Sequence, residues 1–142
     1  MIVVPFIPAH LIGFECIDEQ KDTQSFFNKE YGDYLCMGYA YSFLHDGAVI
    51  AMAGLLDQGG NRFIAWALMS QKTNKFMPII TRLIKGFLNK FNDKRIETIV
   101  LKDFVKGHRW ATMLGFNNET PNGMENYCFD KNYCLYSRVK HG

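Results

Sequence analysis

Several features that define common classes of protein are missing from this sequence of 142 residues. No apolar run approaches the roughly 18 residues that span a bilayer, so we expect no transmembrane helix. The first residues, Met1-Ile2-Val3-Val4-Pro5, contain no basic start and no cleavage signature, so we expect no signal peptide. The net charge is only +2, which predicts no strong field toward nucleic acid or a membrane. Internal repeats, low-complexity tracts and linkers are also absent.

Cysteine is sparse, and its spacing does not indicate a metal site. No C-x-x-C motif or His/Cys cluster accompanies Cys16, Cys36, Cys128 and Cys134, so no bound metal is expected. Without a secretion signal, these four are typical of reduced thiols in a cytosol-like compartment, and Cys128 and Cys134 are candidates to face each other across a hairpin. Hydrophobic residues make up 48% and aromatic residues 15% of the chain, which predicts a single compact domain over residues 1–142.

The middle of the chain has the pattern of a three-stranded antiparallel meander. Apolar stretches predict strands over residues 39–44, 48–56 and 63–69. His45-Asp46-Gly47 and Gly59-Gly60-Asn61 are the turns between them, and Gly47 is expected at positive φ. The run 48–56 is almost wholly apolar, which is typical of a strand covered on both faces.

An amphipathic helix is predicted over residues 76–91. Its apolar side chains recur in steps of three and one and form one stripe: Phe76, Ile79, Ile80, Leu83, Ile84, Phe87, Leu88 and Phe91. Thr73 or Asn74 is expected to cap its start, and Pro78 is tolerated because it falls in the first turn. The next strand is predicted at residues 96–101. A strand–helix–strand order predicts a right-handed crossover between two parallel strands.

Both ends of the chain add further elements. A second helix is predicted over residues 104–114 and closed by Gly115 as a left-handed cap. The chain then predicts a hairpin of residues 124–129 and 133–139 that turns at Asp130-Lys131-Asn132. The first 38 residues indicate a strand at 2–7, a helix start at 9–14 and a helix at 22–30, with Gly32-Asp33 as an interruption.

This order of elements resembles the GNAT acyltransferase fold, an α/β fold whose mixed sheet splays between its fourth and fifth strands and takes up acyl-CoA. The stretches "HDGAVIAMAGL", "AWALMS", "RIETIV", "GHRWATMLGF" and "LYSRV" resemble more narrowly the GNAT-like proteins of tailed phages and prophages, including an internal virion protein family of short-tailed phages. They cover about two-thirds of the chain. "GHRWATMLGF" is the most specific of them.

The resemblance implies two alternative functions. The first is an acetyl-CoA-dependent N-acetyltransferase of the host cytoplasm that acts on a small amine or a protein amine by direct attack. The second is a GNAT-fold protein without catalysis, either an internal component packaged in the virion or a host-interaction protein. Its partners would then be other virion proteins or host proteins.

The resemblance also implies where the cofactor would bind. The GNAT pattern Q/R-x-x-G-x-G/A holds the pyrophosphate on backbone N–H groups at a helix start, but its glycine positions fall on Asn74 and Phe76 in this chain. Lys72 and Lys75 compensate in charge. The residues expected to contact the cofactor are Leu68, Met69, Ser70, Gln71, Lys72, Thr73, Asn74, Lys75 and Phe76. The alternative is an ordinary capped helix with a solvated basic face.

Candidates for proton transfer follow from the same resemblance. The tyrosine that many GNAT enzymes use as general acid falls on Ala111, next to Trp110, so His108 is the acid candidate on this helix. Asp57 and Glu97 are the acidic residues nearest to the strand 63–69 and are the candidates for the general base. Each of the three has the alternative of an ordinary structural or solvated residue.

Three aromatic residues also have two interpretations. Tyr39 and Tyr41 alternate on one face of their strand, where they either line an acceptor cleft or pack. Trp66 either fills the core beside the splay or plugs an acyl pocket.

Overall fold

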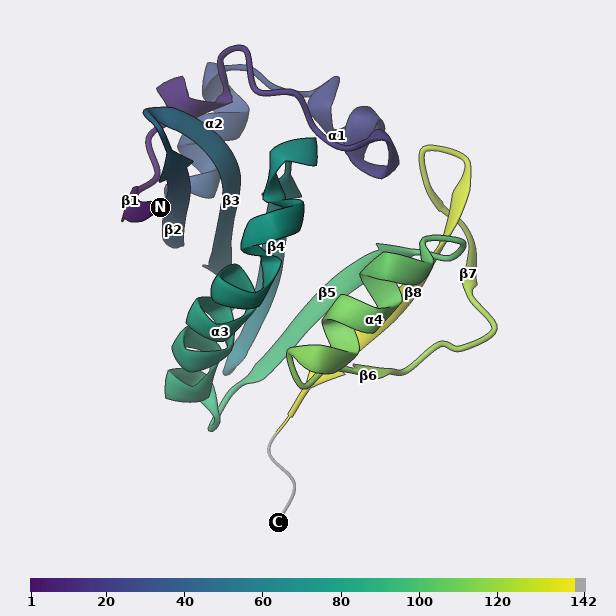
Figure 1. Cartoon of the computed structure of the whole chain (residues 1–142). Coiled ribbons are helices and arrows are strands. Elements are labelled where there is room, and N and C mark those ends of the chain that lie inside the picture. The colour runs from purple at the N-terminus through teal and green to yellow at the C-terminus, as the bar shows by residue number, and fades with distance from the viewer. Residues whose placement is uncertain (140–142) are drawn as a thin grey trace. The chain divides into compact units, whose positions relative to one another are not determined.

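The computed structural model describes residues 1–139, which combine helices with a mixed β-sheet in an α/β fold (Figure 1). The strands are β1 (Ile2–Pro5), β2 (Tyr39–His45), β3 (Ala48–Asp57), β4 (Arg62–Met69), β5 (Arg95–Leu101), β6 (Asn117–Asn118), β7 (Met124–Cys128) and β8 (Lys131–Arg138). The helices are α1 (Lys21–Gln24), α2 (Lys29–Leu35), α3 (Met77–Leu88) and α4 (Val105–Met113). Short 3₁₀ helices are η1 (Pro8–Leu11), η2 (Asp18–Gln20), η3 (Gln71–Phe76) and η4 (Asn89–Phe91).

Hydrogen bonds join the described strands in the order β1-β2-β3-β4-β5-β8-β6, and β7 pairs with β8. The chain forms two compact units. The first contains residues 1–57 and 65–75, and the second contains residues 58–64 and those from 76 onward. β4 therefore begins in the second unit and ends in the first. The prediction of a single domain is not tested by this division. No helix within residues 1–139 has the length and apolar character that a membrane crossing requires.

The predicted order of β2, β3 and β4, the antiparallel pairing of β2 with β3 and the parallel pairing of β4 with β5 are confirmed. The β2–β3 turn has positive φ at Asp46 (51°) and Gly47 (78°), the two-residue turn that suits the twist of a hairpin. β4 and β5 are parallel, and their register runs from Arg62 opposite Arg95 to Ile64 opposite Glu97. This register covers the first three residues of β4, and the rest of the strand extends beyond it to Met69.

The predicted apolar stripe on α3 was too wide. Ile80 and Leu88 are fully buried, but Ile79 and Leu83 are nearly half exposed, at 46% and 45%. The buried side of α3 is therefore formed by residues four apart, Ile80, Ile84 and Leu88. Ile79 and Leu83, each one residue before a member of this row, lie toward solvent. The predicted cap was also wrong. Phe76 occupies the cap position, because residues Gln71–Phe76 form a 3₁₀ helix before α3 begins. Pro78 lies in the first turn of α3, as expected.

The N-terminal predictions need two corrections. The helix start predicted at residues 9–14 is the short 3₁₀ helix η1, and the helix predicted at 22–30 is two helices, α1 and α2. Gly32 does not interrupt α2 but lies inside it, where it is buried. A Cβ on Gly32 would lie only 2.7 Å from Pro8 Cβ, so glycine allows α2 to approach η1 closely.

The C-terminal hairpin turns one residue earlier than predicted. Phe129 and Asp130 both have φ of 54°, and Lys131 already belongs to β8. Gly115 has φ of 94° directly after α4 and confirms the predicted left-handed cap. The predicted strand extended to Val139, whereas β8 ends at Arg138.

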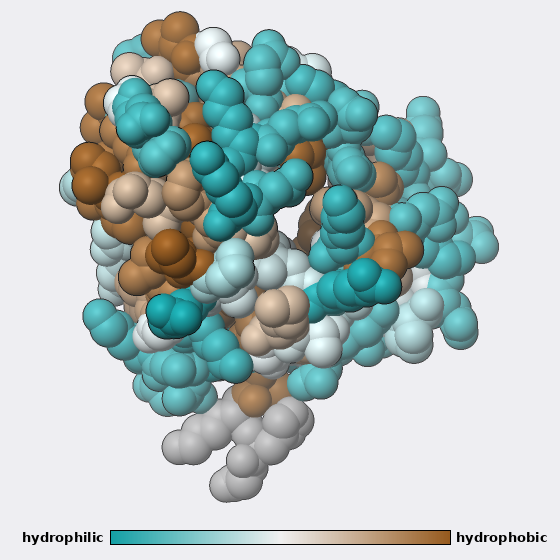
Figure 2. All heavy atoms as spheres, in the orientation of Figure 1, coloured by the Kyte–Doolittle hydropathy of each residue, from teal (hydrophilic) through white to brown (hydrophobic). Residues whose placement is uncertain are grey.

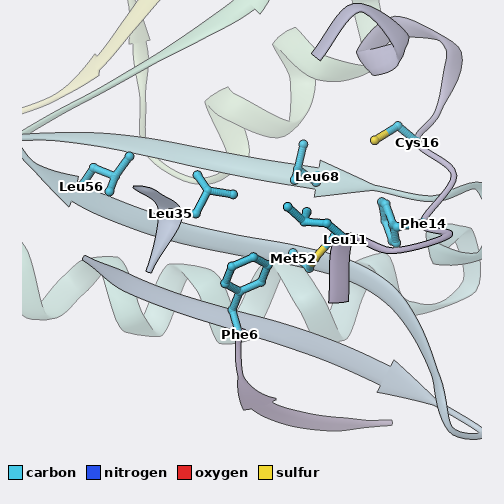
Figure 3. Packing of buried hydrophobic residues seen from close by; sticks show 8 residues of the cluster. All are labelled: Phe6, Leu11, Phe14, Cys16, Leu35, Met52, Leu56 and Leu68. Carbon is cyan, nitrogen blue, oxygen red and sulfur yellow. The ribbon is translucent and has the colours of Figure 1, made fainter. Parts of the chain in front are cut away.

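The first unit has its core on one face of β3 and β4, where η1, α2 and the following loops cover it (Figure 3). Its buried members are Phe6, Leu11, Phe14, Cys16, Leu35, Met52, Leu56 and Leu68. Trp66 packs against this cluster. Its ring and that of Phe6 meet edge to face, with their centroids 5.8 Å apart, which favours its core interpretation. The β1 edge remains apolar and exposed at Ile2 and Val3. Figure 2 shows hydrophobic side chains gathered on the left, where β1 lies in Figure 1.

The second unit has its own buried set. α4 packs on β5, and Gly107 permits that contact because a Cβ there would meet Phe104 and Val100 at under 3 Å. Phe91 contacts both Phe63 and Phe87, which fixes the end of α3 against the start of β4.

Candidate functional site

The end of β4, beyond the residues that pair with β5, forms hydrogen bonds with another part of the first unit. The Met69 N–H donates to Gln20 Oε1 at 2.8 Å, and Gln20 Nε2 donates to Ala67 O at 2.7 Å. The Ile17 N–H donates to Met69 O at 2.9 Å. One carboxamide and one backbone amide thus satisfy three consecutive polar groups at the end of β4. The polar groups of this edge therefore bond to amide groups of the chain itself.

The turn after β4 is held together by Ser70. Its hydroxyl donates to Ile50 O at 2.7 Å and accepts from the Lys72 N–H at 3.3 Å, while Ser70 O accepts from the Thr73 hydroxyl at 2.8 Å. The Thr73 N–H also donates to Ser70 O, at 3.4 Å. Two amides of the expected phosphate turn, those of Lys72 and Thr73, are therefore already bonded within the turn. The amides that follow lie inside the 3₁₀ helix η3, so the anion-binding capacity of the turn rests mainly on lysine charge.

The nine residues expected at the cofactor turn fall into two groups. Four of them are buried: Leu68, Met69, Ser70 and Thr73. Gln71, Lys72, Asn74 and Lys75 are exposed, and Phe76 is half buried. The structure brings them together as one continuous junction from strand to helix, but whether they bind a cofactor remains a prediction.

A hollow of about 510 Å³ lies beside this turn in the first unit. It is lined by Ser70, Gln71 and Lys72 on one side and by His10 and residues 12–16 on another. Burial raises the pKa of the Cys16 thiol in its wall to about 11, so this thiol stays protonated at neutral pH and is a poor nucleophile. Burial lowers the pKa of His10. The Ile7 N–H donates to His10 Nδ1 at 3.3 Å, so that nitrogen is an acceptor, and the Ser42 hydroxyl, 2.7 Å from it, also donates to it.

Glu97 lies in a network of ion pairs in the second unit. Its two oxygens each accept from a guanidinium, Arg62 Nε and Arg95 Nε, both at 2.7 Å. Arg95 also forms a two-fold contact with Glu119 at 2.7 and 2.9 Å. Burial would raise the pKa of Glu97, but the hydrogen bonds from Arg95 and Arg62 outweigh it and lower the pKa. A carboxylate held in this way is a weak proton acceptor, so the geometry favours its structural interpretation.

His108 is also fixed at both ring nitrogens. Nε2 lies 2.7 Å from Lys102 O, which can only accept, so this nitrogen donates. Nδ1 lies 2.6 Å from the Tyr136 hydroxyl, which donates to it when the ring is neutral. The imidazole thus ties α4 to β8 and to the loop after β5. This arrangement favours positioning over proton transfer.

The other predicted residues lie on β2, β3 and α4. Asp57 ends β3 in the first unit and is exposed, whereas Glu97 and His108 belong to the second unit. Tyr39 and Tyr41 are exposed on β2, at 46% and 36%. Trp110 donates from Nε1 to the Thr81 hydroxyl at 2.9 Å and so packs α4 on α3. Among residues 1–139, no group of three His, Cys, Asp or Glu side chains is arranged to bind a metal.

Gln20 and Ile17, which form hydrogen bonds to the β4 edge, were not predicted from the sequence. They lie in the stretch "CIDEQKDTQ", which has neither clear periodicity nor a motif. Their partners are about 50 residues away in the chain. No signal in the sequence pointed to them.

No model of a known protein family matches this sequence, and neither does any curated protein. Solved structures match it along nearly the whole chain. Ard1 from Thermoplasma volcanium has a TM-score of 0.74 at 11% identity, with 99% of this chain and 98% of that chain covered. Ribosomal-protein-S5-alanine acetyltransferase from Vibrio fischeri has a TM-score of 0.70 at 12% identity, with coverage of 97% and 92%. Spermidine N-acetyltransferase SpeG from Vibrio cholerae has a TM-score of 0.64 at 10% identity, with coverage of 97% and 94%.

Identities this low establish the fold alone. Because acetyltransferases of the GNAT family from Bacillus anthracis and Streptococcus pneumoniae match as well, the chain has the GNAT acyltransferase fold.

Proposed function

We propose that this chain is an acyl-CoA-dependent N-acyltransferase that transfers an acetyl group to a small amine or a protein amine by direct attack. The observation that carries the proposal is the end of β4. Its pairing with β5 covers Arg62–Ile64, and farther along it presents polar groups that bind an amide. The fold likeness to two acetyltransferases supports the same function by analogy.

The β4 edge fits an extended amide chain such as the pantetheine arm of CoA. Ala67 O would accept from a ligand N–H, and Met69 would offer its own N–H and carbonyl, which are the groups that now bind Gln20 and Ile17. Lys72 and Lys75, both exposed at the turn, would face the phosphates. When bound, acetyl-CoA would supply the thioester for transfer. Of the predicted bases, Asp57 is the exposed carboxylate and is our candidate to take up the amine proton.

A second function is favoured by three features of the same region. The β4 edge is occupied, the turn has no glycine, and position 111 carries alanine instead of tyrosine. A GNAT-fold protein without catalysis, acting in a phage virion or on a host protein, is consistent with all three. It would need neither a free edge nor a proton donor.

Calorimetry with acetyl-CoA, followed by thiol-release assays, tests the proposal. Spermidine and a peptide that begins with alanine are suitable acceptors because two proteins of this fold act on such substrates by name. We expect binding and release of free thiol with at least one acceptor. Absence of binding at millimolar acetyl-CoA, in this chain and in the Gln20→Ala variant described below, would support the function without catalysis.

A further inference from the structure

Residues 17–20 cover the β4 edge with very little packing of their own. η2 and α1, which contain or follow this segment, have no buried residue. Buried Cys16 precedes the segment, and Phe27, which packs against the core, comes after it. Residues 17–20 themselves are held to the rest of the first unit by three hydrogen bonds to Ala67 and Met69. Local bonds such as Lys21 to Glu15 join residues that flank this segment.

The Gln20 side chain presents to β4 the same groups as a peptide bond. Its oxygen accepts from the Met69 N–H, which can only donate. Its nitrogen donates to Ala67 O, which can only accept. An extended amide ligand on this edge would need the same two partners. The two occupants therefore exclude each other.

We propose that residues 17–20 form an internal competitor that closes the β4 edge in the resting protein. Gln20 acts as a latch, and an amide ligand binds only after this latch is released. This inference rests on the proposed function, because that function names the ligand as CoA. It adds that the resting state of the protein has low affinity for its own cofactor.

The surroundings of the segment leave room for its release. The hollow of about 510 Å³ is lined by Cys16 and Asp18 from this part of the chain and by Ser70 and Gln71 from the turn after β4, so the segment is not packed on that side. Gly13, three residues before Cys16, has φ of 73° and no atom within 4 Å of the position of a Cβ. The backbone at Gly13 therefore has open space beside it, whereas Phe14 and Cys16, which follow it, are buried.

Calorimetric titration with CoA of the full chain and two variants tests the latch. Gln20→Ala removes both hydrogen bonds, whereas Glu19→Ala changes the exposed neighbour that does not contact β4 and serves as the control. If the open state is about a tenth of the population, release of the latch raises the apparent affinity about tenfold. We expect tighter binding by about fivefold or more in Gln20→Ala and no change in Glu19→Ala.

The possible results are distinguishable. Equal affinities in all three proteins, or weaker binding in Gln20→Ala, would overturn the latch but leave the proposed function intact. Absence of binding in all three would overturn the proposed function and the competition with it. Gln20→Glu gives a second variant of nearly the same shape, since its carboxylate cannot donate to Ala67 O. It should also bind CoA more tightly than the parent chain.

Amide hydrogen exchange provides a measurement that does not depend on activity. In Gln20→Ala without ligand, exchange at the Ile17 N–H should accelerate by about tenfold, because its bond to Met69 O is no longer supported. Addition of CoA to the parent chain should also accelerate exchange at Ile17 and leave Met69 protected. Unchanged exchange at Ile17 in both experiments would show that the segment does not open and would overturn the inference.

Discussion

At the scale of single residues, two helical glycines have opposite surroundings. A Cβ on Gly32 would lie 2.7 Å from Pro8 Cβ and 3.0 Å from Pro8 Cα, whereas Gly86 in α3 has no atom within 4 Å of that position. Backbone and ring atoms near Gly32 cannot move aside cheaply. The same substitution therefore has a different sign at the two sites.

We expect Gly32→Ala to destabilise the protein by about 1–3 kcal/mol through overpacking. Gly86→Ala should stabilise it by about 0.5–1 kcal/mol, because alanine loses less backbone entropy in a helix. Urea unfolding followed by circular dichroism measures both. A stabilised Gly32→Ala variant would contradict the close approach of α2 and η1.

Glu119 is the residue whose protonation should matter most at low pH. Hydrogen bonds from Arg95 and Ser137 lower its pKa from 4.5 to about 2. A carboxylate with a lowered pKa in the folded state contributes stability above its unfolded pKa, and this contribution is lost as the pH falls from about 4.5 toward 2. Glu97, whose pKa is also lowered, acts in the same direction.

The free energy of unfolding should therefore fall less steeply between pH 5 and pH 3 in Glu119→Gln than in the parent chain. Glu125→Gln, which changes an exposed residue of β7, is the control and should keep the parental slope. Urea midpoints at pH 7, 5, 4 and 3 provide the comparison. Equal slopes for Glu119→Gln and the parent would mean that the Arg95 contact is not retained in solution.

At the scale of elements, α3 shows how finely burial is divided along one helix. Ile80 is fully buried, and Leu83, less than one turn later, is 45% exposed. Ile80→Ala should cost about 2–5 kcal/mol from lost burial and the cavity that remains. Leu83→Ala should cost less than about 1 kcal/mol, because much of this side chain is already in water. Chemical denaturation of the pair tests which side of α3 faces inward.

The elements themselves were largely predictable, but their contacts were not. Strand and helix periods and the glycines at positive φ located β2 through α4 within a residue or two, except for the end of α3, which was predicted three residues late. These signals are predictive because they are local. The stripe on α3 was overestimated because an apolar side chain does not reveal whether a neighbouring element covers it. Arg138 illustrates a second limit. It donates to Leu88 O at the end of α3 from 50 residues away, and no periodicity encodes such a bond.

The candidate site divides in the same way. The junction from β4 to α3 followed from the order of elements. Ser70, which organises the turn, was named only as one of nine contacts, because its bond to Ile50 O depends on how β3 lies beside β4. Asp57, Glu97 and His108 were chosen by residue type. The ion pairs of Glu97 and the two bonds of His108 depend on tertiary neighbours that type alone does not reveal.

At the scale of the whole molecule, β4 belongs to both compact units. Its residues Arg62–Ile64 pair with β5 in the second unit, and its later residues belong to the first. Loss of either unit would remove part of a strand from the other. We therefore expect residues 1–139 to unfold in one cooperative step.

The two tryptophans allow this expectation to be measured, because Trp66 lies in the first unit and Trp110 in the second. Trp110→Phe leaves a fluorescence signal from the first unit, and Trp66→Phe leaves one from the second. Circular dichroism of each variant corrects for any change in its overall stability. Fluorescence and circular dichroism midpoints should coincide in both proteins. Separate midpoints would show that the units are independent domains.

The Gln20 latch has a consequence for what the protein can sense. A carboxamide carries no charge and does not titrate, so neither protons nor ionic strength shift its contacts with Ala67 and Met69 directly. Attraction from Lys72 and Lys75 is different, because salt screens it over a Debye length of about 8 Å at physiological ionic strength. The latch itself would thus respond to neither acidity nor salt, whereas the amount of ligand needed to displace it would rise as salt weakens the attraction to the two lysines.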